Sequence, residues 1–222
     1  MAYVNGPQAI TSGLVLYLDA ANQKSYSGSG TTWTDLTRNN NATLTNGPTF
    51  SSEGGGAIVF DGTNDYANLG NVLNVGTSDF ALEMWYYKET QTNSFAKIVS
   101  KGAFQAGGWR ILSDNTTTLV FQYGNPQSEI VSATTAINNS WNHGLVTRLN
   151  GNITIYVNGI AGTSTSVSTD LTTNSYNYQI ATSPNSSENW KGRLAVYKHY
   201  SKGLSNQEAL QNFNALRGRF GV

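Results

Sequence analysis

Glu83 is the carboxylate whose surroundings come nearest to those of a glycoside hydrolase. It lies in the run 80–87, FALEMWYY, whose alternation predicts a strand. Retaining glycosidases hold two carboxyl groups about 5 Å apart, flanking the bond that they cleave. The positions that share Glu83's face are Trp85 and Tyr87, and Glu89 lies outside the regular spacing. The sequence therefore argues against glycosidase activity, and we expect Glu83 to be solvated or hydrogen-bonded on the outer face of a sheet.

Other catalytic chemistry has as little support. The chain has two histidines, His143 and His199, and neither lies in a context typical of a nucleophile elbow or a metal pair. It has no cysteine, which removes disulfides, thiolate metal sites and cysteine nucleophiles together. We expect His143 to be structural and the protein not to be an enzyme.

Two carboxylates in one turn are the best candidates for a cation site. Asp61 and Asp65 enclose the segment DGTND and supply hard oxygen atoms, which calcium requires. Asp-Gly segments of this kind are also ordinary turn chemistry. The sequence leaves both interpretations open, so calcium is a possible cofactor and no other cofactor is indicated.

Aromatic side chains could bind the apolar faces of sugars, with amide and hydroxyl groups fixing the orientation. Trp85 and Tyr87 are the strongest candidates, because both face away from the predicted core, and Glu83 lies beside them. The alternative is that tryptophan and tyrosine pack the interior or a subunit interface. The full set of aromatic candidates is Trp85, Tyr87, Trp109, Tyr123 and Trp190.

These side chains must be positioned by many short strands. Phe80, Leu82, Met84 and Tyr86 would form the buried face of the strand that carries Glu83. Asn150-Gly151, between two apolar segments, predicts a two-residue hairpin with a type I′ turn. Short strands separated by turn signals indicate an all-β, two-sheet antiparallel sandwich of the jelly-roll kind.

One α-helix is expected near the C-terminus, at about 205–217. Ser205 and Glu208 form a capping box, in which each side chain satisfies a backbone N–H at the helix start. Gly218 is a plausible stop. The helix would pack on the sandwich, and we expect a single domain over 1–222 with a short N-terminal arm at 1–12.

Composition limits the partners and the compartment. Charged residues make up 12% of the chain and the formal net charge is zero, so nucleic-acid binding is not supported. The N-terminus lacks the features of a signal peptide, and no apolar run approaches a membrane span. We therefore expect a protein that is not exported by a signal peptide and does not bind a membrane.

The order of several short motifs resembles the concanavalin A-like, laminin G type jelly roll over roughly residues 13–217. The motifs are FDG with DY at 60–66, DFALEMW at 79–85, IVSKG at 98–102, WNH at 141–143, IYVNG at 155–159, GRLAVY at 192–197 and LSNQE at 204–208. Enzymes of this fold that cleave β-glucans carry a Glu-x-Asp-x-(x)-Glu strand, from which this chain departs at Trp85. The resemblance implies a lectin-like fold, and calcium in relatives keeps Asp61 and Asp65 of interest.

A narrower resemblance concerns three segments, 13–22, 30–36 and 212–220, which look like laminin G type domains of structural proteins in tailed bacteriophages. It implies a virion component made in the host cytoplasm and carried on the virion surface, as a capsid decoration, fibre or tail appendage. Its partners would be other virion proteins and copies of itself. The alternative is a carbohydrate-binding module that attaches to cell-surface or environmental polysaccharide.

Overall fold

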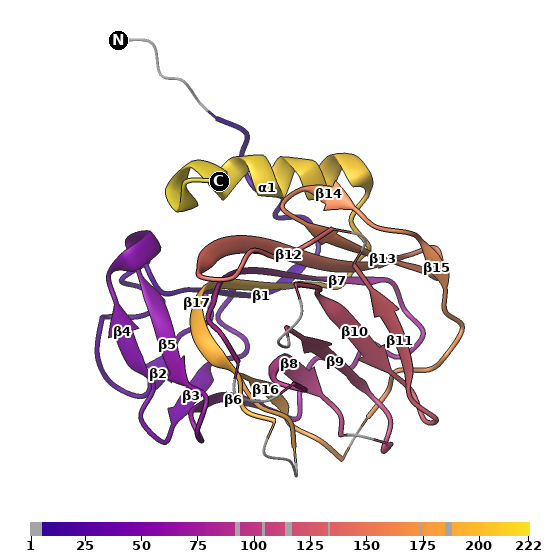
Figure 1. Cartoon of the computed structure of the whole chain (residues 1–222), viewed down its shortest axis with the longest axis horizontal. Helices are drawn as coiled ribbons and strands as arrows, with labels where there is room; N and C mark the ends of the chain where they lie inside the picture. Colours follow the sequence, from indigo (N-terminus) through magenta and orange to yellow (C-terminus); the bar gives the residue numbers. More distant parts are fainter. Residues whose placement is uncertain are drawn as a thin grey trace.

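The computed structural model of this protein describes residues 6–91, 94–103, 105–113, 117–132, 134–173, 175–184 and 188–222. Within these residues the strands form two antiparallel sheets packed face to face, with one α-helix outside them (Figure 1). The expected all-β sandwich is confirmed. Residues 1–5 of the expected N-terminal arm lie outside the described part.

The first sheet, called sheet A, has β7 and β17 at its centre. β17 pairs with β7, β5 and β1, and β7 pairs with β12. The order across the sheet is β14 (Ile160–Ala161), β13 (Asn152–Val157), β12 (Ser140–Leu149), β7 (Phe80–Lys88), β17 (Lys191–Tyr200), β5 (Ala57–Asp61) and β4 (Thr49–Ser51). Two further strands join it, β1 (Leu14–Asp19) beside β17 and β15 (Thr165–Ser166) beside β13.

The second sheet, called sheet B, closes the other side of the sandwich. Its order is β11 (Ser128–Val131), β10 (Val120–Tyr123), β9 (Trp109–Leu112), β8 (Lys97–Lys101), β16 (Tyr178–Ile180), β6 (Tyr66–Gly70), β3 (Ala42–Thr45) and β2 (Thr32–Trp33). A short 3-10 turn, η1 (Glu53–Gly55), links β4 to β5.

The core lies between the sheets and follows the alternation of the strands. Phe80, Leu82, Met84 and Tyr86 of β7 all point into it, as their spacing predicted. They meet the inward face of sheet B, which supplies Trp109, Ile111, Phe121 and Tyr178. The side chains at intervening positions point outward, so each sheet also has an outer face that needs its own cover or its own solvent contacts.

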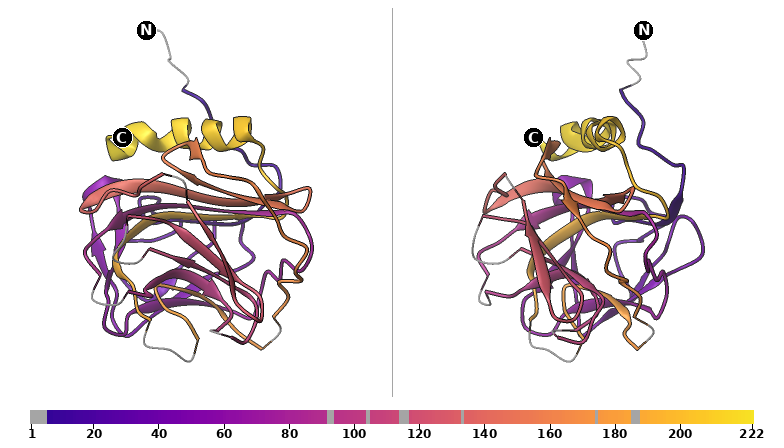
Figure 2. Two further views of the ribbon diagram at one scale, coloured as in Figure 1. Left: turned by 45° about the vertical axis from the view of Figure 1, so that its right-hand side comes forward. Right: turned by 90° about the vertical axis from the view of Figure 1, so that its right-hand side faces the viewer.

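The helix α1 (Asn206–Phe220) covers part of the outer face of sheet A, and Figure 2 shows it lying across that sheet on the side away from sheet B. The Ser205 and Glu208 capping box is present at its start, as predicted. The expected stop at Gly218 is wrong, because the helix continues to Phe220 and Gly221, with φ of 70°, provides the left-handed C-cap.

The described helices contain no segment that is long and apolar enough to cross a membrane.

Candidate functional site

Trp85 lies on the outer face of sheet A, as its strand pattern indicated, but a sugar cannot reach it. Its side chain is fully buried. The ring stacks on Phe213 and Phe220 of α1, with ring centroids 5.8 and 4.4 Å apart. The expected exposure of Trp85 is wrong because the helix covers this face.

Glu83 occupies the same covered face, at the centre of a buried polar network. Its carboxylate accepts hydrogen bonds from Lys198 Nζ (3.2 Å), Tyr200 Oη (3.1 Å) and Asn212 Nδ2 (2.6 Å), and His143 Nε2 lies 3.4 Å away. Burial would raise the pKa of this carboxyl, but the charge of Lys198 and the interactions with His143 outweigh it and hold the pKa at about 2. Glu83 is therefore ionised and anchors α1, so the solvated alternative is wrong and the hydrogen-bonded one is right.

The other aromatic candidates lie mostly in the interior. Trp109 and Trp190 are fully buried between the sheets, where Trp109 meets the ring of Tyr178 edge-on at 5.1 Å. Tyr87 is half-buried and packs against Trp141, with Arg193 4.4 Å above its ring. The structure thus does not bring the predicted sugar-binding residues together on one accessible surface.

The carboxylates of Asp61 and Asp65 accept hydrogen bonds from backbone N–H groups of the turn that they enclose. Asp61 Oδ1 accepts the backbone N–H of Thr63 at 2.7 Å, and this bond lowers the pKa of Asp61. Asp65 is buried, which raises its pKa, and its Oδ2 accepts the N–H of Asp61 at 3.2 Å. No cluster of three or more acidic, His or Cys side chains suited to a metal occurs in the part of the chain that is described. Calcium takes about six to eight oxygens, so calcium at this turn stays a prediction.

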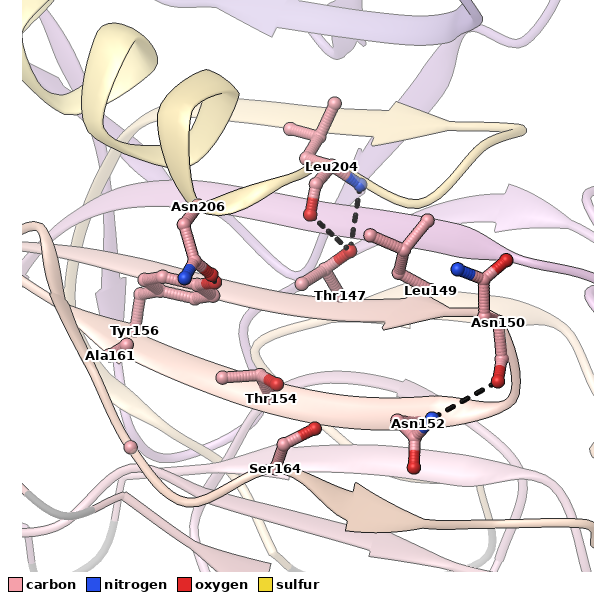
Figure 3. A pocket seen from close by; sticks show the side chains of 11 residues that line it. Thr147, Leu149, Asn150, Asn152, Thr154, Tyr156, Ala161, Ser164, Leu204 and Asn206 are labelled. Atoms are coloured by element: carbon pink, nitrogen blue, oxygen red, sulfur yellow. Dashed lines mark hydrogen bonds between the residues drawn. The ribbon is translucent and has the colours of Figure 1, made fainter.

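A pocket of about 330 Å³, called the hairpin pocket, opens on the outer face of sheet A where α1 begins (Figure 3). The helix covers the central strands of this face and leaves the end of the β12–β13 hairpin open. The pocket is lined by Thr147, Leu149, Asn150, Asn152, Thr154, Tyr156, Ala161, Gly162, Ser164, Leu204 and Asn206.

The hairpin itself forms because Asn150 and Gly151 adopt the positive φ values, 51° and 75°, of the predicted type I′ turn. This fixes the register of β12 and β13, with Leu149 opposite Asn152. Ile153 and Ile155 then point into the core. The outer positions of β13, Asn152 and Thr154, therefore line the floor of the pocket.

A second hairpin builds one wall. Asn158 and Gly159, with φ of 51° and 78°, turn the chain back along the edge of β13 as β14. The N–H of Gly162 still donates to Ile155 O at 2.8 Å; the chain then leaves the edge and returns to it as β15, opposite Asn152 and Ile153. This detour carries Ser164 to the rim of the pocket.

The start of α1 builds the opposite wall. The Thr147 hydroxyl accepts the N–H of Leu204 at 2.8 Å, which ties the residues before the helix to β12. Asn206, at the first turn, accepts a hydrogen bond from the Tyr156 hydroxyl through its Oδ1, and Figure 3 shows its side chain lying over the Tyr156 ring. The pocket thus joins two consecutive hairpins with the start of α1, which is distant from them in sequence.

Amide and hydroxyl groups with unused hydrogen-bonding capacity gather in the hairpin pocket. The side chains of Asn150, Thr154 and Ser164 make no hydrogen bond to another described residue, and Asn152 uses only its Nδ2, towards Asn150 O at 3.1 Å. None of the described lining residues is charged. Such groups donate and accept in similar measure, which suits a neutral polyhydroxylated ligand, and none of them is a general base at neutral pH.

Sequence reasoning missed this pocket because it followed aromatic and acidic side chains. The alternation in β13 was a usable signal, since Asn152 and Thr154 stand opposite Ile153 and Ile155 and so mark a polar outer face. Ser164 and Asn206 carried no comparable signal, because their place beside β13 depends on the second hairpin and on the docking of α1.

The sequence model of the concanavalin A-like lectin/glucanase superfamily matches residues 61–209. The chain belongs to this superfamily. The expected concanavalin A-like, laminin G type fold is therefore confirmed. No curated protein sequence matches the chain significantly.

Solved structures of similar fold include several binding domains. The binding domain of Paraclostridial Mosquitocidal Protein 1 superposes with a TM-score of 0.74 at 19% identity. The match covers 91% of the present chain and 52% of the toxin structure. Domain 4 of AbnA, an extracellular arabinanase of Geobacillus stearothermophilus solved with arabinotriose, gives 0.72 at 16% identity, covering 92% and 100%. The binding domain of botulinum neurotoxin serotype D gives 0.70 at 14% identity, covering 90% and 51%. The chain therefore spans about half of each toxin binding domain and all of the arabinanase domain.

Proposed function

We propose that this chain is a non-catalytic carbohydrate-binding domain that holds a neutral glycan in the hairpin pocket. The observation that carries the proposal is the convergence of uncharged amide and hydroxyl groups from β13, the 162–164 segment and the start of α1. A sugar offers hydroxyls that both donate and accept, and a C–H face of the sugar can rest on Leu149, which is exposed at the same rim.

Two features support the absence of catalysis. Glu83, the carboxylate in the strand that would have to act in a glucanase, is buried beneath α1 and ion-paired with Lys198. The described lining of the hairpin pocket contains no Asp, Glu or His. Glycoside hydrolysis usually requires two carboxyl groups beside the scissile bond, so binding without turnover is the function that this geometry supports.

The similar structures support a glycan as the ligand class. Domain 4 of the arabinanase was solved with arabinotriose, a neutral oligosaccharide, and this chain covers the whole of that domain. The toxin structures are binding domains by name. At this level of identity the likeness concerns the fold, so the ligand is inferred from the pocket itself.

The test is binding of neutral oligosaccharides by an array, followed by titration of the best ligand. The variant Thr154→Ala/Ser164→Ala removes two hydroxyls from the pocket, and its matched control, Thr43→Ala/Ser52→Ala, removes two exposed hydroxyls elsewhere. Each lost hydrogen bond is worth about 1 kcal/mol, so we expect roughly tenfold or greater weakening in the pocket variant alone. A blank array, or equal affinities for the two variants, would contradict the proposal.

We also propose that a tailed bacteriophage particle carries this domain on its surface, with other virion proteins and further copies of the chain as partners. The three segments that resemble phage domains meet in the fold. Arg219 Nη1 donates to Asp19 at 3.0 Å, and Asp35 Oδ1 accepts the N–H of Tyr17 at 2.8 Å. The resemblance therefore describes one packed unit rather than three scattered matches.

Mass spectrometry of purified particles tests this second proposal. We expect the chain to be present in a fixed copy number, and native mass spectrometry of the isolated protein to show a symmetric oligomer. Absence from particles, together with a monomer at all concentrations, would overturn it and leave the glycan-binding proposal standing.

A further inference from the structure

The outer face of sheet B carries a row of polar side chains that lies away from α1, the α-helix of the described residues. Arg110, Gln122 and Glu129 lie opposite one another on β9, β10 and β11. Their strand neighbours Ile111 and Phe121 point into the core, so this row points away from it.

Arg110 is an unusual member of this row, because it is a buried cation without a counter-ion. It has no exposed surface, and no carboxylate among the described residues lies within 4.0 Å of it. Its Nη2 donates to Gln127 Oε1 at 2.6 Å, whereas Nε and Nη1 have no hydrogen-bond partner in the described structure. Burial lowers the pKa of Arg110, and the charges of Glu188 and Glu129 compensate only in part.

A pocket of about 170 Å³ is lined in part by Gln127, the side chain that accepts the hydrogen bond of the Arg110 guanidinium. Gln122 and Gln127 both donate to Glu129 Oε1, at 2.6 and 3.1 Å. The ring of Phe95, 58% exposed, stands at the rim. The pocket, called the Arg110 pocket, is lined by Phe95, Lys97, Gln122, Gln127 and Glu188.

We infer that the Arg110 pocket binds a carboxylate-bearing sugar residue of an acidic polysaccharide. A ligand carboxylate takes the place of the Gln127 amide oxygen on the guanidinium and supplies the direct carboxylate contact that Arg110 lacks, in a bidentate pair. The ring of Phe95, with Lys97 Nζ 5.6 Å from its centroid, keeps enough exposed surface to contact the C–H groups of the sugar. The released amide of Gln127 and the side chain of Gln122 meet the sugar hydroxyls.

This site differs from the hairpin pocket in place and in chemistry. The hairpin pocket lies on the outer face of sheet A and is uncharged. The Arg110 pocket lies on the outer face of sheet B, has Lys97 and Glu188 in its lining, and is connected to the buried Arg110 through Gln127. Lys97 in its lining is paired with Glu188 at 3.2 Å, so Arg110 is the cation without a carboxylate partner here. Glu188 and Glu129 act on Arg110 only from a distance, so a direct contact is open to a ligand with one carboxylate.

Calorimetric titration with trigalacturonate tests the inference, with its methyl ester as a matched neutral control of the same shape. We expect the acid to bind at least tenfold more tightly than the ester, and the affinity to fall as salt is added. Equal binding of acid and ester, or no binding of the acid, overturns the inference.

Variants locate the site. Phe95→Ala should weaken acid binding about tenfold, while Phe50→Ala, which removes another exposed phenyl ring on β4, should not. Arg110→Gln should abolish the preference for the acid, and Arg110→Lys should restore part of it because the charge returns without the fork geometry. If Arg110→Gln fails to fold, the Phe95 and Phe50 pair decides, and equal affinities for those two variants overturn the inference. Thr154→Ala/Ser164→Ala should leave acid binding unchanged, so this result is independent of the neutral-glycan proposal.

Discussion

The outer faces of sheet A and sheet B each contain a buried charged side chain, and the two side chains differ in the partners that compensate the charge. On sheet A, Glu83 is enclosed by α1 and accepts hydrogen bonds from Lys198, Tyr200 and Asn212. On sheet B, Arg110 is equally buried but bonds only to the neutral side chain of Gln127 in the described structure. The first charge is fully compensated within the chain, and the second is not.

This difference separates a structural charge from a candidate binding group. A buried ion is stable when its partners lie within the protein, and removing a partner leaves an uncompensated charge. A buried ion without a carboxylate in contact lowers the stability of the folded state. A binding site can retain such an ion when its ligand supplies the carboxylate. The same physical rule therefore assigns Glu83 to the packing of the helix and Arg110 to recognition.

The largest expected difference is in the free energy of unfolding, when Glu83 and Arg110 are each replaced by a neutral residue. Glu83→Gln leaves Lys198 buried without a counter-ion and should lower the free energy of unfolding by about 3–5 kcal/mol. Arg110→Gln removes a charge that has no ion pair, so it should cost much less or even stabilise the fold. Urea unfolding of both variants measures the difference.

The surface pair of Glu53 and Arg193 provides the control for this comparison. Both side chains are partly exposed, and Glu53→Gln should change the free energy of unfolding by less than about 1 kcal/mol. Equal losses for Glu83→Gln and Arg110→Gln would show that the two charges are compensated alike, and the distinction between the faces would fail.

The pH dependence of stability sharpens the same comparison. The pKa of Glu83 is about 2 in the folded chain, against 4.5 without the fold, so its contribution is complete above pH 4.5 and is lost as the pH falls towards 2. This shift corresponds to about 3 kcal/mol. Arg110 does not titrate in this range, so it contributes no equivalent loss.

His199 adds a separate acid-dependent loss that must be distinguished. Burial lowers the pKa of His199 from 6.5 to about 3, so the imidazole is neutral in the fold and its contribution disappears as the pH falls from 6.5 towards 3. Unfolding measured between pH 7 and 2.5 should show both losses in the natural sequence. Glu83→Gln should keep the His199 loss, which runs down to about pH 3, and should lack the additional steepening that Glu83 causes below pH 4.5. A curve that runs parallel to the natural one below pH 4.5 would contradict the assignment.

The sandwich could be predicted because its signals are local. The alternation of Phe80, Leu82, Met84 and Tyr86 marks a face of one strand, and Asn150-Gly151 marks a turn, so neither depends on distant parts of the chain. The capping box at Ser205 is local in the same sense. These elements therefore agree with the structure.

The candidate sites could not be predicted in the same way. The pattern placed Trp85 and Glu83 correctly on the outer face, but whether that face is open depends on where a helix from the other end of the sequence docks. Arg110 gave no signal, because the absence of a counter-ion is a property of the packed sheet. Polar residues such as Asn206 line a pocket only because the start of α1 packs beside the β12–β13 hairpin and the segment 161–164.

The smallest expected effects come from alanine substitutions at two glycines. Gly151 lies in the turn of the β12–β13 hairpin, and Gly218 lies in α1, which covers part of the same sheet. Gly151→Ala should lower the free energy of unfolding by about 1 kcal/mol, since φ of 75° strains a residue with a Cβ although the space around it is empty. Gly218→Ala lies within α1 with no atom within 4 Å of its Cβ, so it should raise that free energy by about 0.5–1 kcal/mol. Because the turn orients Asn150 and Asn152, Gly151→Ala should also weaken neutral-glycan binding, whereas Gly218→Ala should leave it unchanged. Titration of both variants with the same oligosaccharide measures this, and a loss of binding in the Gly218 variant would mean that the ligand contacts the helix rather than the hairpin.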